Sequence, residues 1–268
     1  PLFAAVSAPT GKSTAVEGGF RVSGRWAYAS GAHMAEWIVL MTICDEPAGP
    51  RVVVIPRDAA ELHDDWHVAA LQGTGSVDVL VADLFVPEEM TGSPFSTQRR
   101  GGAQYMKLGY RGYVGGENVG FSLGVAQRMV DEIARLAPTK KRVLDPTPVG
   151  DRGAFQAELG RTDAALRAAR AYVITELDRA MEIAERGDAP IDAAEMARVG
   201  AAIGFATESI CQAATRLFPY AGAGALHLSN PIQRSFRDLL GSGQHIVATN
   251  ETLEHWGKVL MAQQAGNP

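Results

Sequence analysis

The pattern of hydrophobic positions changes its period along the chain, and its first part is typical of β-structure. Runs rich in β-branched residues occupy 37–43 and 51–55, and the residues between them, 45–50, favour a turn. A third run, 77–86, alternates over much of its length and ends at Pro87. Several short strands joined by turns predict a small β-barrel or sandwich over residues 1 to about 92.

From about residue 114 the apolar positions recur with the spacing of helices. One broad stripe ends at Pro138, and a second helix is expected over about 152–186, with Gly187 as its stop. Asp192 can cap a third helix, and two more helical stretches follow at about 231–241 and 244–263. Long helices joined by short loops predict a four-helix bundle.

The expected organisation is therefore α+β, with two domains. A β domain is expected at residues 1–95 and a C-terminal helical bundle at residues 96–268, with 93–113 as the candidate linker. An apolar helical stripe is ordinarily core, but alanine-rich helices such as 164–171 pack closely, and an outer face of the bundle can pair with a second copy.

Composition narrows the class of protein. The chain has 268 residues, of which 46% are hydrophobic and 21% charged, and its net charge of −5 argues against a nucleic-acid partner. No apolar stretch has the length of a membrane span, and the first residues lack the features of a signal peptide. Cys44 and Cys211 are far apart and form no metal-binding spacing. We expect a cytoplasmic protein that holds no metal.

The first candidate element for chemistry is the glycine-bounded run 18–31. Trp26, Tyr28 and Ser30 lie at alternate positions, which share one side of an extended strand. Two aromatic rings and a hydroxyl on one side make a wall for a flat ring with a polar edge. Composition alone favours the alternative, in which the aromatic residues belong to the core and Ser30 is a turn residue.

Two further segments contain glycines beside residues that could bind a ligand. The sequence Gly73-Thr74-Gly75-Ser76 offers amides and hydroxyls that suit a phosphate or a polar ring edge, although it is also common as a turn before a strand. It lacks the Gly-Lys-Ser/Thr of a Walker loop and the βαβ context of a Rossmann fingerprint. Later, glycines at 222 and 224 allow close approach of a ligand, and His245 carries the side chain best suited to proton transfer near neutral pH. A lone histidine is more often structural than catalytic.

These elements, in this order, resemble the acyl-CoA dehydrogenase superfamily. The segments that carry the resemblance are 18–31, the run 73–88 with Gly-Thr-Gly-Ser and Phe-Val-Pro-Glu, and the Arg-Asp and Gln-His pairs of 237–245. Within the superfamily the chain is most similar to flavin-dependent monooxygenases, the oxygenase components of two-component hydroxylases. The resemblance implies a central β domain and a C-terminal four-helix bundle, with the family's N-terminal helical domain absent from this chain.

The resemblance also implies roles for individual residues. Ser30 matches the hydroxyl at the flavin N5 edge, Tyr28 the aromatic beside the ring, and Arg142 a phosphate contact. The 73–76 loop matches one near the ring and phosphate, and the 221–224 loop one that reaches a neighbouring subunit's flavin. The full set of implied cofactor-binding residues is Trp26, Tyr28, Ser30, Gly31, Thr74, Gly75, Ser76, Arg142, Ala221, Gly222, Ala223 and Gly224.

His245 distinguishes two branches of the superfamily. Acyl-CoA dehydrogenases use a Glu in this late segment to remove a substrate proton, whereas here no Glu occurs until Glu251. The monooxygenase branch places a His there, which implies that His245 assists deprotonation of a phenol or amine. Ser30, the second implied catalytic residue, would limit loss of hydrogen peroxide.

The implied activity is hydroxylation of a small aromatic or amine substrate with O2 and reduced FMN or FAD. A separate flavin reductase would supply the reduced flavin, and the expected assembly is a homo-oligomer, a dimer or homotetramer. Two alternatives stay open: an acyl-CoA dehydrogenase-like oxidoreductase with an unusual base, and a non-catalytic fragment or scaffold, which the missing N-terminal domain motivates.

Overall fold

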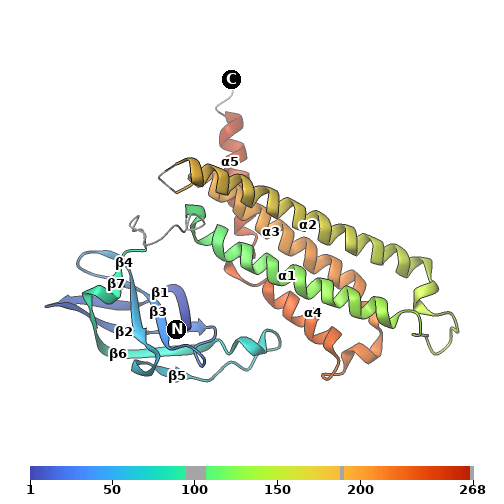
Figure 1. Ribbon diagram of the computed structural model, residues 1–268, viewed down its shortest axis with the longest axis horizontal. Helices are drawn as coiled ribbons and strands as arrows, with labels where there is room; N and C mark the ends of the chain where they lie inside the picture. The colour runs from blue at the N-terminus through green and yellow to red at the C-terminus, as the bar shows by residue number, and fades with distance from the viewer. Residues whose placement is uncertain (95–106, 188–189, 266–268) are drawn as a thin grey trace. The chain divides into compact units, whose positions relative to one another are not determined.

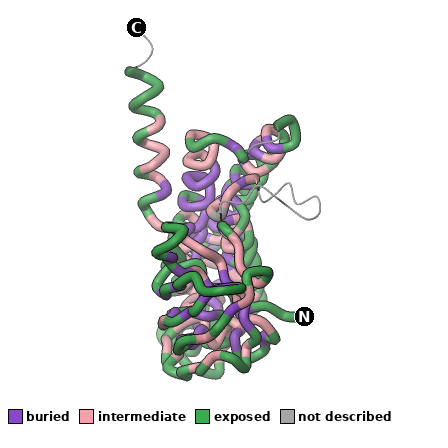
Figure 2. Tube along the Cα trace, turned by 90° about the vertical axis from the view of Figure 1, so that its left-hand side faces the viewer, coloured by how far each residue is buried: buried purple, intermediate pink, exposed green. Residues whose placement is uncertain are grey.

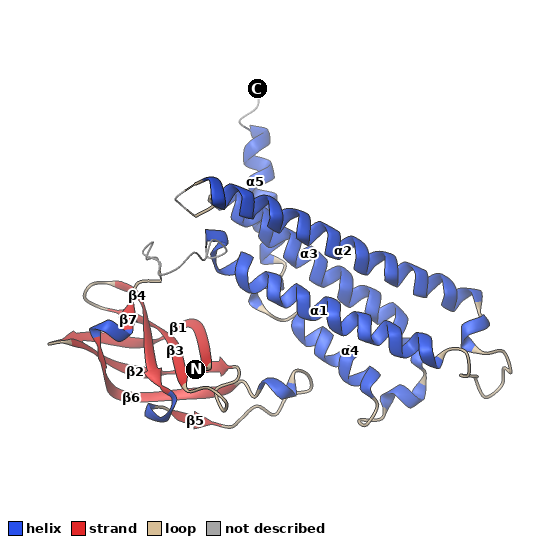
Figure 3. Cartoon of the chain, in the orientation of Figure 1, coloured by secondary structure: helices blue, strands red, loops and turns tan. Residues whose placement is uncertain are grey.

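The structure, a computed structural model, describes residues 1–94, 107–187 and 190–265. The chain divides into two compact units, Pro1–Arg100 and Gly101–Pro268, each with its own hydrophobic core. The first unit contains the strands and the second the long helices, as Figure 3 shows by colour. The expected division after residue 95 and most of the expected linker lie outside the described residues.

The β unit is one seven-stranded sheet (Figure 1) with the order β5-β6-β2-β1-β3-β4-β7. Its strands are β1 (Phe3–Val16), β2 (Gly19–Ala29), β3 (Trp37–Cys44), β4 (Gly49–Pro56), β5 (Glu61–His63), β6 (Val77–Pro87) and β7 (Thr91–Gly92). Among the strands that the structure describes, the β1–β3 pair alone is parallel. The two edge strands, β5 and β7, are short and do not pair with each other, so among the described residues the sheet does not close into a barrel, and no second sheet forms a sandwich.

Trp26 organises the core of this sheet. Its side chain is fully buried, and its indole N–H donates to the carbonyl of Met41 at 2.7 Å. Gly11 faces the ring so closely that a Cβ there would lie 1.9 Å from Trp26 Cζ2. A glycine at this position therefore leaves the space that the indole fills.

The helical unit packs around α3. Its helices are α1 (Gly109–Leu136), α2 (Gly153–Arg186), α3 (Ala193–Leu217), α4 (Pro231–Ser242) and α5 (Glu251–Ala265), and α3 contacts each of the other four. Asp192 caps α3 as predicted, accepting a hydrogen bond from the Glu195 backbone N–H. A Cβ at Gly115 would lie 2.5 Å from Ile203 Cδ1, so glycine permits the close crossing of α1 and α3.

The last predicted helix, 244–263, is wrong at its start. Residues Ile246–Ala248 form a separate 3-10 turn, and α5 begins only at Glu251. Figure 2 shows α5 mostly exposed. Thr252 is buried, and no other described residue of this helix is. Among the described residues, no helix combines the length and the apolar character needed to cross a membrane.

Candidate functional site

Three hydroxyl groups meet at one end of the β2–β6 pair. Ser30 Oγ lies 2.7 Å from Ser76 Oγ, which lies 2.7 Å from Thr74 Oγ1. The register explains the meeting: Ala29 of β2 faces Val77 of β6, so Ser30 and Ser76 are the next residues outward on the two strands. The Gly31 N–H donates to the Thr74 carbonyl at 2.8 Å and ties the segments together. The structure thus joins two elements that lie more than forty residues apart.

The backbone around these hydroxyls is open. Gly31 and Gly75 have φ of +77° and +51°, values that glycine adopts without strain. A Cβ added at Gly31 or Gly73 would meet nothing within 4 Å. Ser30 is itself exposed. A flat, polar-edged ligand can therefore approach the backbone of this corner, where the exposed Ser30 oxygen suits the polar edge of an isoalloxazine ring.

The expected shared face of Trp26, Tyr28 and Ser30 is wrong. Tyr28 has φ of +67°, and the β2–β6 register shifts between Trp26 and Ala29, so the regular alternation of the strand is lost. Trp26 points into the core, so it is not part of the candidate binding surface. This agrees with the alternative that its ring belongs to the core. Tyr28 is 70% exposed and makes an edge-to-face contact with Trp66, with ring centroids 6.0 Å apart.

Trp66 is a neighbour of the site that the sequence pattern did not indicate. Its indole N–H donates to the Leu71 carbonyl at 3.1 Å, which anchors the segment leading to Thr74. It lies outside every strand, in a run with no periodicity, so its position depends on the tertiary fold alone.

His245 lies in the α4–α5 connection of the helical unit, at the start of the 3-10 turn. Its Nδ1 accepts a hydrogen bond from the Val247 N–H at 3.4 Å. Desolvation by surrounding atoms lowers the pKa of His245 below its usual value, so the ring is neutral at neutral pH. With Nδ1 accepting, the proton of the neutral ring sits on Nε2. The ring then offers a donor to a substrate oxygen, whereas removing a substrate proton requires loss of the Val247 bond.

The glycine loop 221–224 lies at the other end of α4 from His245. This helix has 12 residues, so it separates the two by about 18 Å. Gly222 has φ of +64°, and a Cβ there would lie 2.7 Å from Lys140 Cε, so the Lys140 side chain covers this glycine. Ala221 is buried, Ala223 and Gly224 are exposed, and Arg142 is exposed in the neighbouring loop 137–148. The helical unit thus does not gather its predicted site residues into one cluster.

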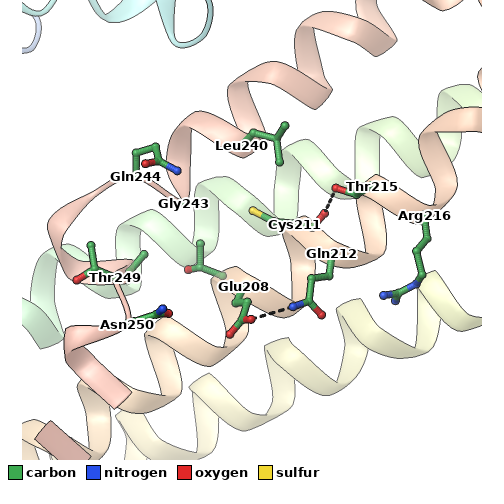
Figure 4. Close-up of a pocket in the computed structure, with 12 residues that line it drawn as sticks. Glu208, Cys211, Gln212, Thr215, Arg216, Leu240, Gly243, Gln244, Thr249 and Asn250 are labelled. Atoms are coloured by element: carbon green, nitrogen blue, oxygen red, sulfur yellow. Dashed lines mark hydrogen bonds between the residues drawn. The ribbon is translucent and has the colours of Figure 1, made fainter. Parts of the chain in front are cut away.

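A pocket of about 670 Å³ opens on the helical unit between α3, the end of α4 and residues 248–250 (Figure 4). Its lining includes Glu208, which accepts a hydrogen bond from Gln212 Nε2 at 2.8 Å. Cys211 lies in the same wall, and its burial raises the pKa of the thiol to about 11, which makes it a poor nucleophile. Gln244 lines the pocket beside His245 in sequence.

Comparison with known proteins gives a consistent result. Residues 118–250 match the family described as "Acyl-CoA dehydrogenase, C-terminal domain". The chain is 29% identical to an indole-3-acetate monooxygenase of Pseudomonas putida, over 98% of this chain and 68% of that protein. It is 25% identical to the oxygenase component of an FADH(2)-dependent resorcinol hydroxylase of a Rhizobium species, over 89% and 63% of the two chains.

A solved structure shares the fold. XiaF from a Streptomyces species, solved with FADH2 and glycerol, superposes with a TM-score of 0.84 at 24% identity, covering 97% of this chain and 68% of that one. The chain thus spans about two thirds of the length of the curated relatives and the structure that it matches.

Proposed function

We propose that this chain, a member of the acyl-CoA dehydrogenase superfamily, acts as the oxygenase component of a flavin-dependent monooxygenase. The observation that carries the proposal is the hydrogen bond between the exposed Ser30 hydroxyl and the buried Ser76 hydroxyl at an open glycine turn. The resemblance assigns this position to the flavin N5 edge. Relatives over nearly the whole chain bear monooxygenase names. By the same reasoning we assign the sheet to the family's central β domain and α1–α4 to its four-helix bundle.

Reduced FMN or FAD would supply the electrons that activate O2 and allow one oxygen atom to pass to the substrate. The chain's own residues would bind the flavin and orient it. Ser30 and the 73–76 loop hold the polar edge of the ring, and Tyr28 supplies an exposed aromatic surface beside it. Lys140, whose side chain covers Gly222, is a cation at the 221–224 loop, and the exposed Arg142 lies two residues further along the chain. Both suit phosphate oxygens.

For His245 we propose a positioning contact to the substrate. Its neutral ring, with Nε2 protonated, donates a hydrogen bond to the oxygen of a phenol or phenolate and so orients the ring carbon that is oxidised. The substrate class is a small aromatic or amine compound, and a separate flavin reductase is the proposed partner. The names of the relatives, which include a resorcinol hydroxylase oxygenase component, support the substrate class and the reductase partner.

We also propose a homo-oligomer, through the end of the helical unit that carries the 221–224 loop. Four apolar side chains of the two loops at this end are strongly exposed: Val143, Leu144, Leu226 and Leu228. Covering such residues with a second copy would stabilise the assembly by removing apolar surface from water.

An anaerobic titration with reduced FMN and reduced FAD, followed by mixing with O2, tests the proposed function. Saturable binding of a reduced flavin, and a change in its rate of oxidation when bound, are the expected results. Reduction of oxidised flavin by an acyl-CoA, with electrons passed to a dye in the absence of O2, would instead favour the dehydrogenase alternative. Absence of binding to any flavin would favour a scaffold.

A further inference from the structure

We infer that Ser76 and Thr74 fix the direction of the Ser30 hydroxyl, and that the site thereby selects reduced flavin over oxidised flavin. The inference rests on the proposed function, because it concerns the same flavin edge. It adds two positioning residues, and it gives a physical reason for the use of reduced flavin that the resemblance implies.

The direction follows from counting hydrogens. Thr74 Oγ1 lies 2.8 Å from the Leu71 carbonyl oxygen, Ser76 Oγ lies 2.7 Å from Thr74 Oγ1, and Ser30 Oγ lies 2.7 Å from Ser76 Oγ. Two oxygens so close need a hydrogen between them. The three contacts therefore require three hydrogens, and the three hydroxyl groups carry three.

The Leu71 carbonyl settles which way the chain runs, since it has no hydrogen to give. Thr74 must donate to Leu71, so Ser76 must donate to Thr74, and Ser30 must donate to Ser76. Leu71 is itself held by hydrogen bonds from the Thr74 N–H and the Trp66 indole, at 3.1 Å each. With its hydrogen directed inward, Ser30 Oγ presents only lone pairs to a ligand.

An acceptor at this position discriminates between the two redox states. Reduced flavin carries a hydrogen on N5 and can donate it to Ser30 Oγ. Oxidised flavin has a lone pair on N5, which would face the lone pairs of Ser30 and gain no hydrogen bond. The three linked hydroxyls thus favour reduced flavin, which a reductase delivers, over oxidised flavin, which remains after turnover.

Two variants interrupt this row of hydrogen bonds at different residues. In Thr74→Val, Ser76 loses its acceptor and becomes free to donate to Ser30, which releases the Ser30 hydrogen toward the ligand. In Ser76→Ala, Ser30 loses its acceptor directly. Thr10→Val is the matched control, because Thr10 is an exposed hydroxyl of the same sheet that also donates to a carbonyl, that of Arg25 at 2.7 Å.

The readout is the ratio of dissociation constants of oxidised and reduced flavin, measured by anaerobic fluorescence titration with FMN and with FAD. We expect the parent protein to bind the reduced form more tightly. Each of the two variants should lower the ratio about tenfold, the effect of one hydrogen bond, and Thr10→Val should leave it unchanged. The midpoint potential of the bound flavin should fall by about 30 mV in the two variants.

An unchanged ratio in Ser76→Ala, with flavin still bound, would overturn the inference while leaving the proposed function intact. Failure of the parent protein to bind either flavin would instead refute the proposed function. Circular dichroism of each variant checks the fold. If Thr74→Val does not fold, the ratio measured for Ser76→Ala tests the inference.

Discussion

The pair formed by Glu176 of α2 and Arg198 of α3 gives a sharp test of how the helical unit is held together. The Glu176 side chain is only 6% exposed, and its carboxylate accepts two hydrogen bonds from Arg198, at 2.6 and 2.9 Å. Arg179 adds one long contact at 3.5 Å. Arg198→Ala would leave a buried carboxylate with that weak contact alone.

The magnitude follows from this geometry. A hydrogen bond to a charged group contributes about 1.5–3 kcal/mol, and breaking a buried ion pair costs about 3–5 kcal/mol. The Arg198 side chain is 38% exposed, so solvent screening reduces the loss. We expect Arg198→Ala to lower the free energy of unfolding by about 2–3 kcal/mol, which for a unit of this size lowers Tm by roughly 4–12 °C.

Thermal unfolding followed by circular dichroism measures the loss, with Arg167→Ala as the control. Arg167 also lies on α2 and pairs with Asp163 at 2.8 Å, but its side chain is 80% exposed. Its removal should lower the free energy of unfolding much less, because solvent screens an exposed ion pair. Equal losses in the two variants would refute the reasoning that burial makes the Glu176 pair strong.

The same pair predicts a dependence on pH. Hydrogen bonds from Arg198 hold the pKa of Glu176 below its usual value. The pair therefore contributes its full stability above the unfolded pKa of about 4.3, and this contribution is lost as pH falls through the lower folded pKa. The difference in Tm between the parent protein and Arg198→Ala should be largest near neutral pH and shrink on acidification.

Three further predictions concern function and assembly. Ser30→Ala should raise the yield of hydrogen peroxide per flavin oxidised, measured by a peroxide assay; an unchanged yield would exclude the protective role. His245→Gln keeps a donor but no base, so it should retain much of the hydroxylation that His245→Ala loses, as product chromatography would show; equal loss would favour the base. Leu144→Asp with Leu228→Asp should shift the assembly toward smaller species in sedimentation velocity, and an unchanged assembly would place the interface elsewhere.

Local patterns predicted the elements well. Helical periodicity and the Gly187 stop gave the extent of α2, and Asp192 marked the start of α3. The start of α5 was missed because apolar residues run through 246–248, where a 3-10 turn capped by His245 replaces the helix. The open edges of the sheet were missed because strand order is not encoded in the period of any one strand.

The candidate site was predictable only in part. Glycine-bounded turns indicated two segments that the fold brings together. The alternation rule failed at Tyr28, where a positive φ turns one aromatic outward and leaves Trp26 in the core. The meeting of Ser30 with Ser76 depends on the register of β2 against β6, a long-range pairing that no local pattern specifies.

The measurement that tests the central proposal most directly is the fate of the two atoms of ¹⁸O2. The chain would be supplied with reduced flavin by a reductase, given a panel of small aromatic substrates that includes indole-3-acetate and resorcinol, and analysed by mass spectrometry. A monooxygenase places one ¹⁸O atom in the hydroxylated product, and Ser30→Ala should divert part of that label to hydrogen peroxide. Recovery of all the label as peroxide, together with oxidation of an acyl-CoA without O2, would contradict the proposal.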